Sequence, residues 1–144
     1  MKLRPTPHSL FLLLLSLSFL ACGSDDGGDT IAECQDTFCT LELRRIIIRV
    51  SDATQEPVAL DAIQVLERQS GNELTLTLSD SEWDNARETG QYPLIEDGVL
   101  GLLQETELQF TGFVNGQAVI SAMYTVGTDC CHINLIDGET DLSL

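Results

Sequence analysis

Cysteine has the clearest chemistry in this chain, because four of its five cysteines fall into two close pairs. These four are Cys34, Cys39, Cys130 and Cys131. An even number of thiols predicts disulfides where a chain is exported, which the pattern of its first residues, described below, indicates. A bridge between the neighbours Cys130 and Cys131 would distort the peptide that joins them, so we expect both to reach back to the N-terminal pair. Of the two remaining connectivities we favour the one that joins Cys39 to Cys131, because the strand pattern described below places Cys131 inward.

Zinc is the competing use of these side chains, since thiolates and an imidazole are zinc ligands and His132 follows Cys131. Adjacent residues on a strand point to opposite faces, so Cys131 and His132 cannot easily bind one ion. The same geometry disfavours a Cys–His nucleophile pair. Export also favours disulfides over thiolates. We therefore expect no metal centre.

A second group of candidate residues lies between positions 80 and 92. The possible ligand-binding residues there are Asp80, Glu82, Trp83, Asp84 and Tyr92. The three acids occupy alternate positions, as calcium-loop ligands do, but Asn85 and Gln91 stand where that loop requires Gly and Glu. Two interpretations stay open for the acids, and two for the aromatic residues. The acids form either a weak calcium site or a solvated loop, and Trp83 either forms a sugar-binding platform with Tyr92 or folds back onto the core.

The composition excludes several classes of function. After residue 21 the chain holds five Arg, no Lys and all 23 acids. This balance excludes a nucleic-acid reader, which needs clustered basic side chains, and argues against electrostatic binding to an anionic membrane. The chain has no Gly-rich phosphate loop, no nucleophile elbow and no repeat. With so many acids, carboxylate pairs arise by abundance alone, so we expect the protein not to be an enzyme.

The elements that position these residues are expected to be strands. Beyond Cys39 the hydrophobic pattern has a period of two, with alternating runs near residues 45–50, 63–65, 74–78, 108–110, 118–126 and 131–135. Asn115-Gly116 between two runs predicts a type I′ hairpin. In the 74–78 run the leucines would face the core and Thr75 the solvent. In the last run Cys131 would face inward, and His132 outward.

The spacing of these runs predicts an all-β, antiparallel sandwich of about seven strands over residues 39–144. Turn signals separate the runs at regular intervals. The segment from Ser79 to Gly90 is the one long irregular stretch, with at most a helical turn at residues 81–84.

The first 21 residues have the pattern of a secretory signal peptide. Lys2 and Arg4 precede an apolar run at residues 10–20, which is too short for a comfortable transmembrane helix. The run ends in Phe19-Leu20-Ala21-Cys22, which resembles the lipobox of bacterial lipoproteins. The resemblance implies that Cys22 becomes the first residue and carries diacylglycerol and an added acyl chain such as palmitate. Two or three acyl chains form a lasting membrane anchor.

The resemblance also implies a location in the cell envelope. Gly23, not Asp, follows Cys22, which favours the outer over the inner membrane and leaves periplasmic and surface-facing positions open. Residues 22–38 would be the lipidated N-terminus and a flexible acidic tether, since residues 23–30 have no side chain to bury. Asp25, Asp26 and Asp29 there form either a solvated linker or a surface-export signal. No cofactor is expected beyond the lipid on Cys22.

Three short motifs suggest a family for the folded part. Residues 49–52 (Arg-Val-Ser-Asp), 56–58 (Glu-Pro-Val) and 90–92 (Gly-Gln-Tyr) resemble the carboxypeptidase-regulatory-like domain, an immunoglobulin-like, transthyretin-like sandwich frequent in exported bacterial proteins. Cys131-His132-Ile133 is similar to the Cys-His-Val ending of small lipoproteins of this type. The resemblance spans about residues 41–136 and supplies no catalytic residue. It implies a non-enzymatic structural or protein-interaction module with an envelope protein as partner; the alternative is a glycan- or calcium-binding module.

Overall fold

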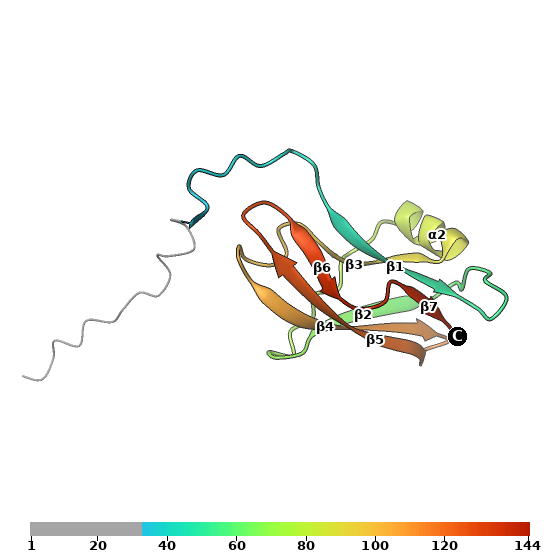
Figure 1. Cartoon of the computed structure of the whole chain (residues 1–144). Coiled ribbons are helices and arrows are strands. Elements are labelled where there is room, and N and C mark those ends of the chain that lie inside the picture. The colour runs from blue at the N-terminus through green and yellow to red at the C-terminus, as the bar shows by residue number, and fades with distance from the viewer. Residues whose placement is uncertain (1–32) are drawn as a thin grey trace, which may run out of the picture.

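The computed structural model describes residues 33–144, so the signal peptide, Cys22 and residues 23–30 lie outside the described residues. The described chain forms two β-sheets and one helix (Figure 1). In chain order the elements are β1 (Arg45–Ser51), β2 (Ala62–Glu67), α2 (Asp80–Thr89), β3 (Gln91–Glu96), β4 (Glu105–Val114), β5 (Gln117–Thr128), β6 (Ile133–Asp137) and β7 (Asp141–Ser143). The prediction of an all-β sandwich is confirmed.

The two sheets have the strand orders β3-β1-β7 and β2-β4-β5-β6. Neighbouring strands are antiparallel except β1 and β7, which pair in parallel. In β1, β2 and β4 alternate side chains point into one apolar core, as the period of two predicts, whereas β3 buries four consecutive residues. The side chains with no exposed surface are Ile48, Val50, Leu60, Val65, Tyr92, Leu94, Ile95, Leu108, Phe110 and Val126.

The β4–β5 hairpin follows the sequence prediction closely. Asn115 and Gly116 have φ values of 53° and 74°, the left-handed conformation that a type I′ turn requires at both positions. The backbone N–H of Asn115 also donates to the carboxylate of Asp61, which fixes the turn against the segment before β2.

The predicted strand at residues 74–78 is wrong. Only Glu73 forms a β-bridge, with Leu66, and the three leucines that follow are half-buried in a segment that belongs to no strand. Thr75, which we expected to face solvent, is half-buried, and its hydroxyl accepts the N–H of Val65 at 2.9 Å. The Thr75 side chain thus accepts the Val65 N–H that the backbone of a neighbouring strand would otherwise accept, and the pairing with β2 does not continue as a strand.

The segment expected to be irregular is instead a ten-residue helix, α2, which packs against β3 (Figure 1). Its N-cap is Ser79, whose side chain accepts the N–H of Glu82, while the Glu82 carboxylate accepts the N–H of Ser79. This reciprocal pair is a capping box. Gly90 ends the helix at φ 70°, with its N–H donated to the Ala86 carbonyl, as a left-handed C-cap does.

Candidate functional site

Two disulfides fasten the segment before β1 to the turn between β5 and β6. Cys34 is bonded to Cys130 and Cys39 to Cys131, with Cα atoms 5.3 Å apart in both bridges. Neither bridge joins sequence neighbours, and the favoured Cys39–Cys131 pair is confirmed. The expectation that Cys131 faces the core is wrong, because it is only half-buried and precedes β6, so the bridges lie at the edge of the sandwich.

His132 lies beside these bridges and is buried, with 8 % of its surface exposed, although the strand pattern predicted that it faces outward. The strand alternation does not apply to it, because β6 begins only at Ile133. Residues 129–132 form a turn in which the Asp129 carboxylate accepts the N–H groups of both Cys131 and His132, at 2.6 and 2.7 Å. This turn directs the imidazole inward.

The His132 ring joins two segments that are far apart in the sequence. Its Nδ1 lies 2.8 Å from the Asp97 carboxylate, and its Nε2 lies 3.0 Å from the Thr40 hydroxyl. We call the two disulfides and this row of hydrogen bonds the N-terminal clamp. Its members are Cys34, Cys39, Thr40, Asp97, Cys130, Cys131 and His132.

Asp97 is the electrostatic centre of the N-terminal clamp. Burial alone raises the pKa of its carboxyl. The N–H of Arg44 at 2.8 Å, the His132 ring and the N–H of Ile133 at 2.7 Å outweigh that effect and lower the pKa to about 2. The ionised carboxylate therefore accepts bonds from the incoming chain, from the β5–β6 turn and from β6 at once.

The order carboxylate, imidazole, hydroxyl also occurs in hydrolases with a catalytic triad. Here the hydroxyl belongs to Thr40, which directly follows the Cys39 bridge, and the carboxylate also accepts two backbone N–H groups. Every group in the row thus connects the incoming segment to the sandwich. We interpret the arrangement as a structural lock.

The structure brings together the two aromatic residues predicted to form a ligand platform, but it buries one of them. Tyr92 has no exposed surface, and its hydroxyl accepts the N–H of Leu60 and donates to the carbonyl of Val58, both at 2.7 Å. Trp83 is half-buried against the core, with its ring 6.3 Å from that of Tyr92 and the Arg87 guanidinium over it. The platform is therefore wrong, and the fold-back of Trp83 is what the structure has.

The three acids proposed as weak calcium ligands lie on α2, not in a loop. Alternate residues of an α-helix are about 200° apart around its axis, so Asp80, Glu82 and Asp84 cannot converge on one ion. Glu82 serves the capping box and pairs with Arg45 at 3.3 Å. Within residues 33–144 no three His, Cys, Asp or Glu side chains are grouped to hold a metal ion.

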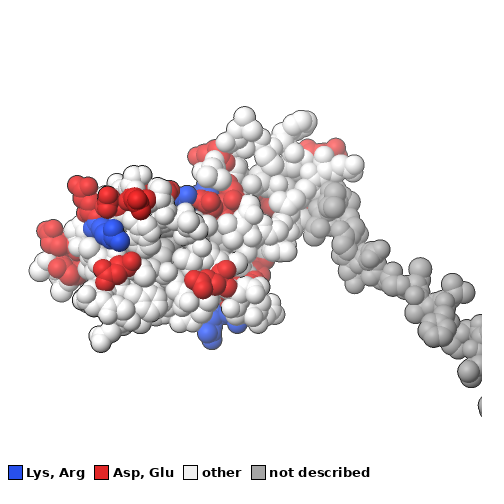
Figure 2. All heavy atoms as spheres, turned by 180° about the vertical axis from the view of Figure 1, so that it is seen from behind, with Lys and Arg blue, Asp and Glu red and all other residues white. Residues whose placement is uncertain are grey.

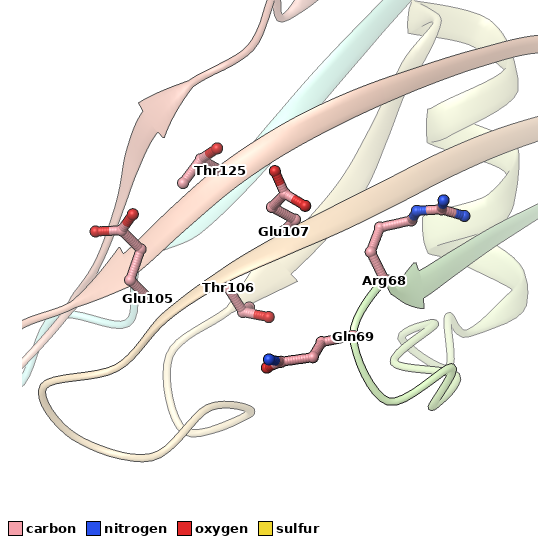
Figure 3. A pocket seen from close by; sticks show the side chains of 6 residues that line it. All are labelled: Arg68, Gln69, Glu105, Thr106, Glu107 and Thr125. Carbon is pink, nitrogen blue, oxygen red and sulfur yellow. The ribbon is translucent and has the colours of Figure 1, made fainter.

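An open hollow of about 420 Å³ lies between the turn after β2 and the start of β4 (Figure 3). Its lining residues are Arg68, Gln69, Glu105, Thr106, Glu107 and Thr125. The guanidinium of Arg68 donates to the Gln109 amide oxygen at 3.1 Å. Sequence reasoning named none of these residues, because their shared surface arises only when β2 and β4 pair.

Comparisons of this chain with known protein families, with curated proteins and with solved structures found no match. Among residues 33–144, no helix combines the length and the hydropathy needed to cross a bilayer.

Proposed function

We propose that this protein is an exported lipoprotein, anchored through lipid on Cys22, whose sandwich is a non-enzymatic structural or protein-interaction module of the cell envelope. The observation that carries this proposal is the N-terminal clamp. Two disulfides in a small domain are typical of an oxidising compartment outside the cytosol. Both bridges fasten the segment that follows the predicted lipid anchor. We place the anchor in the outer membrane, with either a periplasmic or a surface-facing domain.

The clamp gives this arrangement a mechanical rationale. β1 begins only at Arg45, and most of the residues between Cys34 and Arg45 are exposed. Without the bridges, a pull on the tether would be resisted there by the few non-covalent contacts of this segment. With them, force passes directly from the tether to the turn between β5 and β6. The tether that the sequence predicts would then be about a dozen residues long, which for a flexible coil corresponds to an average span of roughly 20 Å.

We further propose that the sandwich is of the transthyretin-like, immunoglobulin-like type that the sequence resembles. The three motif segments lie together, which supports this. The N–H of Val50 donates to the Gly90 carbonyl at 2.8 Å, and the N–H of Val58 donates to the Val50 carbonyl at 3.0 Å. An experimental structure of residues 33–144, compared strand by strand with such domains, tests this assignment.

The alternative of a glycan- or calcium-binding module has less support from the geometry. Tyr92 is buried, and Glu82 lies on the opposite side of α2 from Asp80 and Asp84, so neither predicted ligand site is assembled.

Metabolic labelling with palmitate tests the anchor. We expect label on the parent chain and on the control Ser24→Ala, and none on Cys22→Ala, which should move to the soluble envelope fraction. Labelling that survives Cys22→Ala, or a parent chain that takes up no label, would overturn the proposal.

Growth with an alkylating reagent, followed by mass spectrometry, tests the compartment. Cys34, Cys39, Cys130 and Cys131 should be protected as disulfides in cells.

A further inference from the structure

Large apolar side chains are exposed around the N-terminal clamp. Phe38 and Leu41 are fully exposed, and Leu43 is 63 % exposed. Leu102 is 46 % exposed and lines a small hollow together with Cys131 and His132, so it lies at the same end of the sandwich. We call these four residues the apolar rim. Single exposed apolar residues are ordinary, but three within six positions of one segment indicate a surface that something else covers.

The clamp holds the rim in place. Phe38 and Leu41 flank Cys39 and Thr40, which are tied to Cys131 and His132. The exposed side chains are therefore attached to the edge of the sandwich by covalent bonds, yet they do not fold back onto the core. Figure 1 shows this segment running outside both sheets, at the end of the domain where the grey chain begins.

Acidic side chains are unevenly distributed on one face of the domain. On the face shown in Figure 2, more of them lie toward the end remote from the grey chain than near it. Four acids close to the rim are exposed, namely Glu33, Asp36, Glu42 and Asp129. Carboxylates are repelled by anionic lipid and tolerated by zwitterionic headgroups. The exposed acids therefore disfavour an anionic membrane surface and are compatible with a zwitterionic one.

We propose that the apolar rim inserts into the zwitterionic headgroup layer of the membrane that holds the Cys22 lipid, so that the domain rests on the bilayer by this end. The proposal rests on the proposed lipid anchor. A tether averaging roughly 20 Å keeps the rim within reach of the surface, and the anchor makes the second contact intramolecular. Apolar side chains at such interfaces lie about 5 to 10 Å deep. The contact is made by apolar side chains, so it needs no basic residues, and the acids beside it are tolerated where the headgroups are zwitterionic.

The test uses the chain from residue 22 onward, coupled through the Cys22 thiol to maleimide lipid in phosphatidylcholine vesicles. This coupling bypasses cellular lipidation, so failure of the rim and failure of the palmitate test are distinguishable. Trp83 is the only Trp, so Trp83→Phe provides a background for single probes. In it, Phe38→Trp should be quenched by brominated phosphatidylcholine at least about twofold more than Ile136→Trp, a probe on β6 that is 49 % exposed in the parent.

A second measurement keeps Trp83. In neutron reflectometry of the coupled layer, the parent domain should begin at the headgroups, and Phe38→Asp with Leu41→Asp should open a water gap. Val119→Asp with Met123→Asp, on exposed positions of β5, should leave the layer unchanged. Equal quenching of the two probes, or a gap already present in the parent, would overturn the proposal. Protection of Phe38→Trp from an aqueous quencher without vesicles would assign the rim to a second copy of this chain, and would overturn it too.

Discussion

The N-terminal clamp and the apolar core hold this small domain together by different physical means. In the core, residues of both sheets bury their side chains completely, and Phe110 and Tyr92 are among the largest. In the clamp, an exposed segment that buries little is held by two disulfides and an ionised carboxylate. The difference shows where each kind of bond is needed. Disulfides and the hydrogen bonds of an ionised carboxylate stabilise the segment before β1, which buries too little apolar surface to be held by packing alone.

The largest effect should come from removing both bridges with Ser at all four clamp cysteines. The bridges span 96 and 92 residues, so the loss should be about 5 to 7 kcal/mol, most of it from constraint of the unfolded chain. Urea unfolding measures it. Cys39→Ser with Cys131→Ser should cost only about 2 kcal/mol, because the Cys34–Cys130 bridge still closes the long loop. Equal losses in the two variants would contradict this account.

A core truncation should come next. Phe110→Ala should lower the free energy of unfolding by about 3 to 5 kcal/mol, because it leaves a cavity between the sheets. Phe38→Ala is the matched control at a fully exposed position, and should change that free energy by less than about 0.5 kcal/mol. Similar losses for the two substitutions in urea unfolding would contradict the contrast between the buried core and the exposed segment that the clamp holds.

Tyr92→Phe isolates a polar bond within the core. The substitution leaves the Leu60 N–H and the Val58 carbonyl without their partner in a buried place, which should cost about 1 to 3 kcal/mol. Tyr124→Phe is the control, because that hydroxyl makes a single bond, to the Glu139 carbonyl at 2.8 Å, and should cost less. Thermal unfolding of the two variants measures the difference in stability. A smaller loss of stability for Tyr92→Phe than for Tyr124→Phe would exclude a stabilising role for the two hydrogen bonds of Tyr92.

The smallest effect should appear as pH dependence. The pKa of Asp97 falls from 3.8 to about 2 on folding, so the folded state favours the ionised form. Its stabilisation is complete above the unfolded pKa and is lost as the pH falls from about 4 to 2, by about 1 to 2 kcal/mol. Unfolding followed from pH 7 to pH 2 should show a shallower decline for Asp97→Asn than for the exposed control Asp36→Asn. Parallel declines would mean that another group carries the acid sensitivity.

Several parts of the fold were predictable because their signals are local. The β4–β5 hairpin follows from Asn115-Gly116 between alternating runs, and the core face of β1 from Ile48 and Val50. The helix α2 also had its signals, since Ser79, Glu82 and Gly90 form a capping box and a C-cap. These signals delimit the whole helix, whereas the prediction reaches only a helical turn at residues 81–84.

The sequence by itself determined the properties that depend on residue type and local spacing: an acidic chain with four cysteines suited to disulfides, and strands with one apolar face. Only the tertiary structure decided which distant residues meet. Asp97 and His132 are 35 positions apart, and no periodicity pairs them. The positions of the two disulfides at the edge of the sandwich were decided in the same way, because strand alternation ends at a turn and the packing of the two sheets then determines what each turn residue contacts. The burial of Tyr92 likewise depends on the segments that pack around β3.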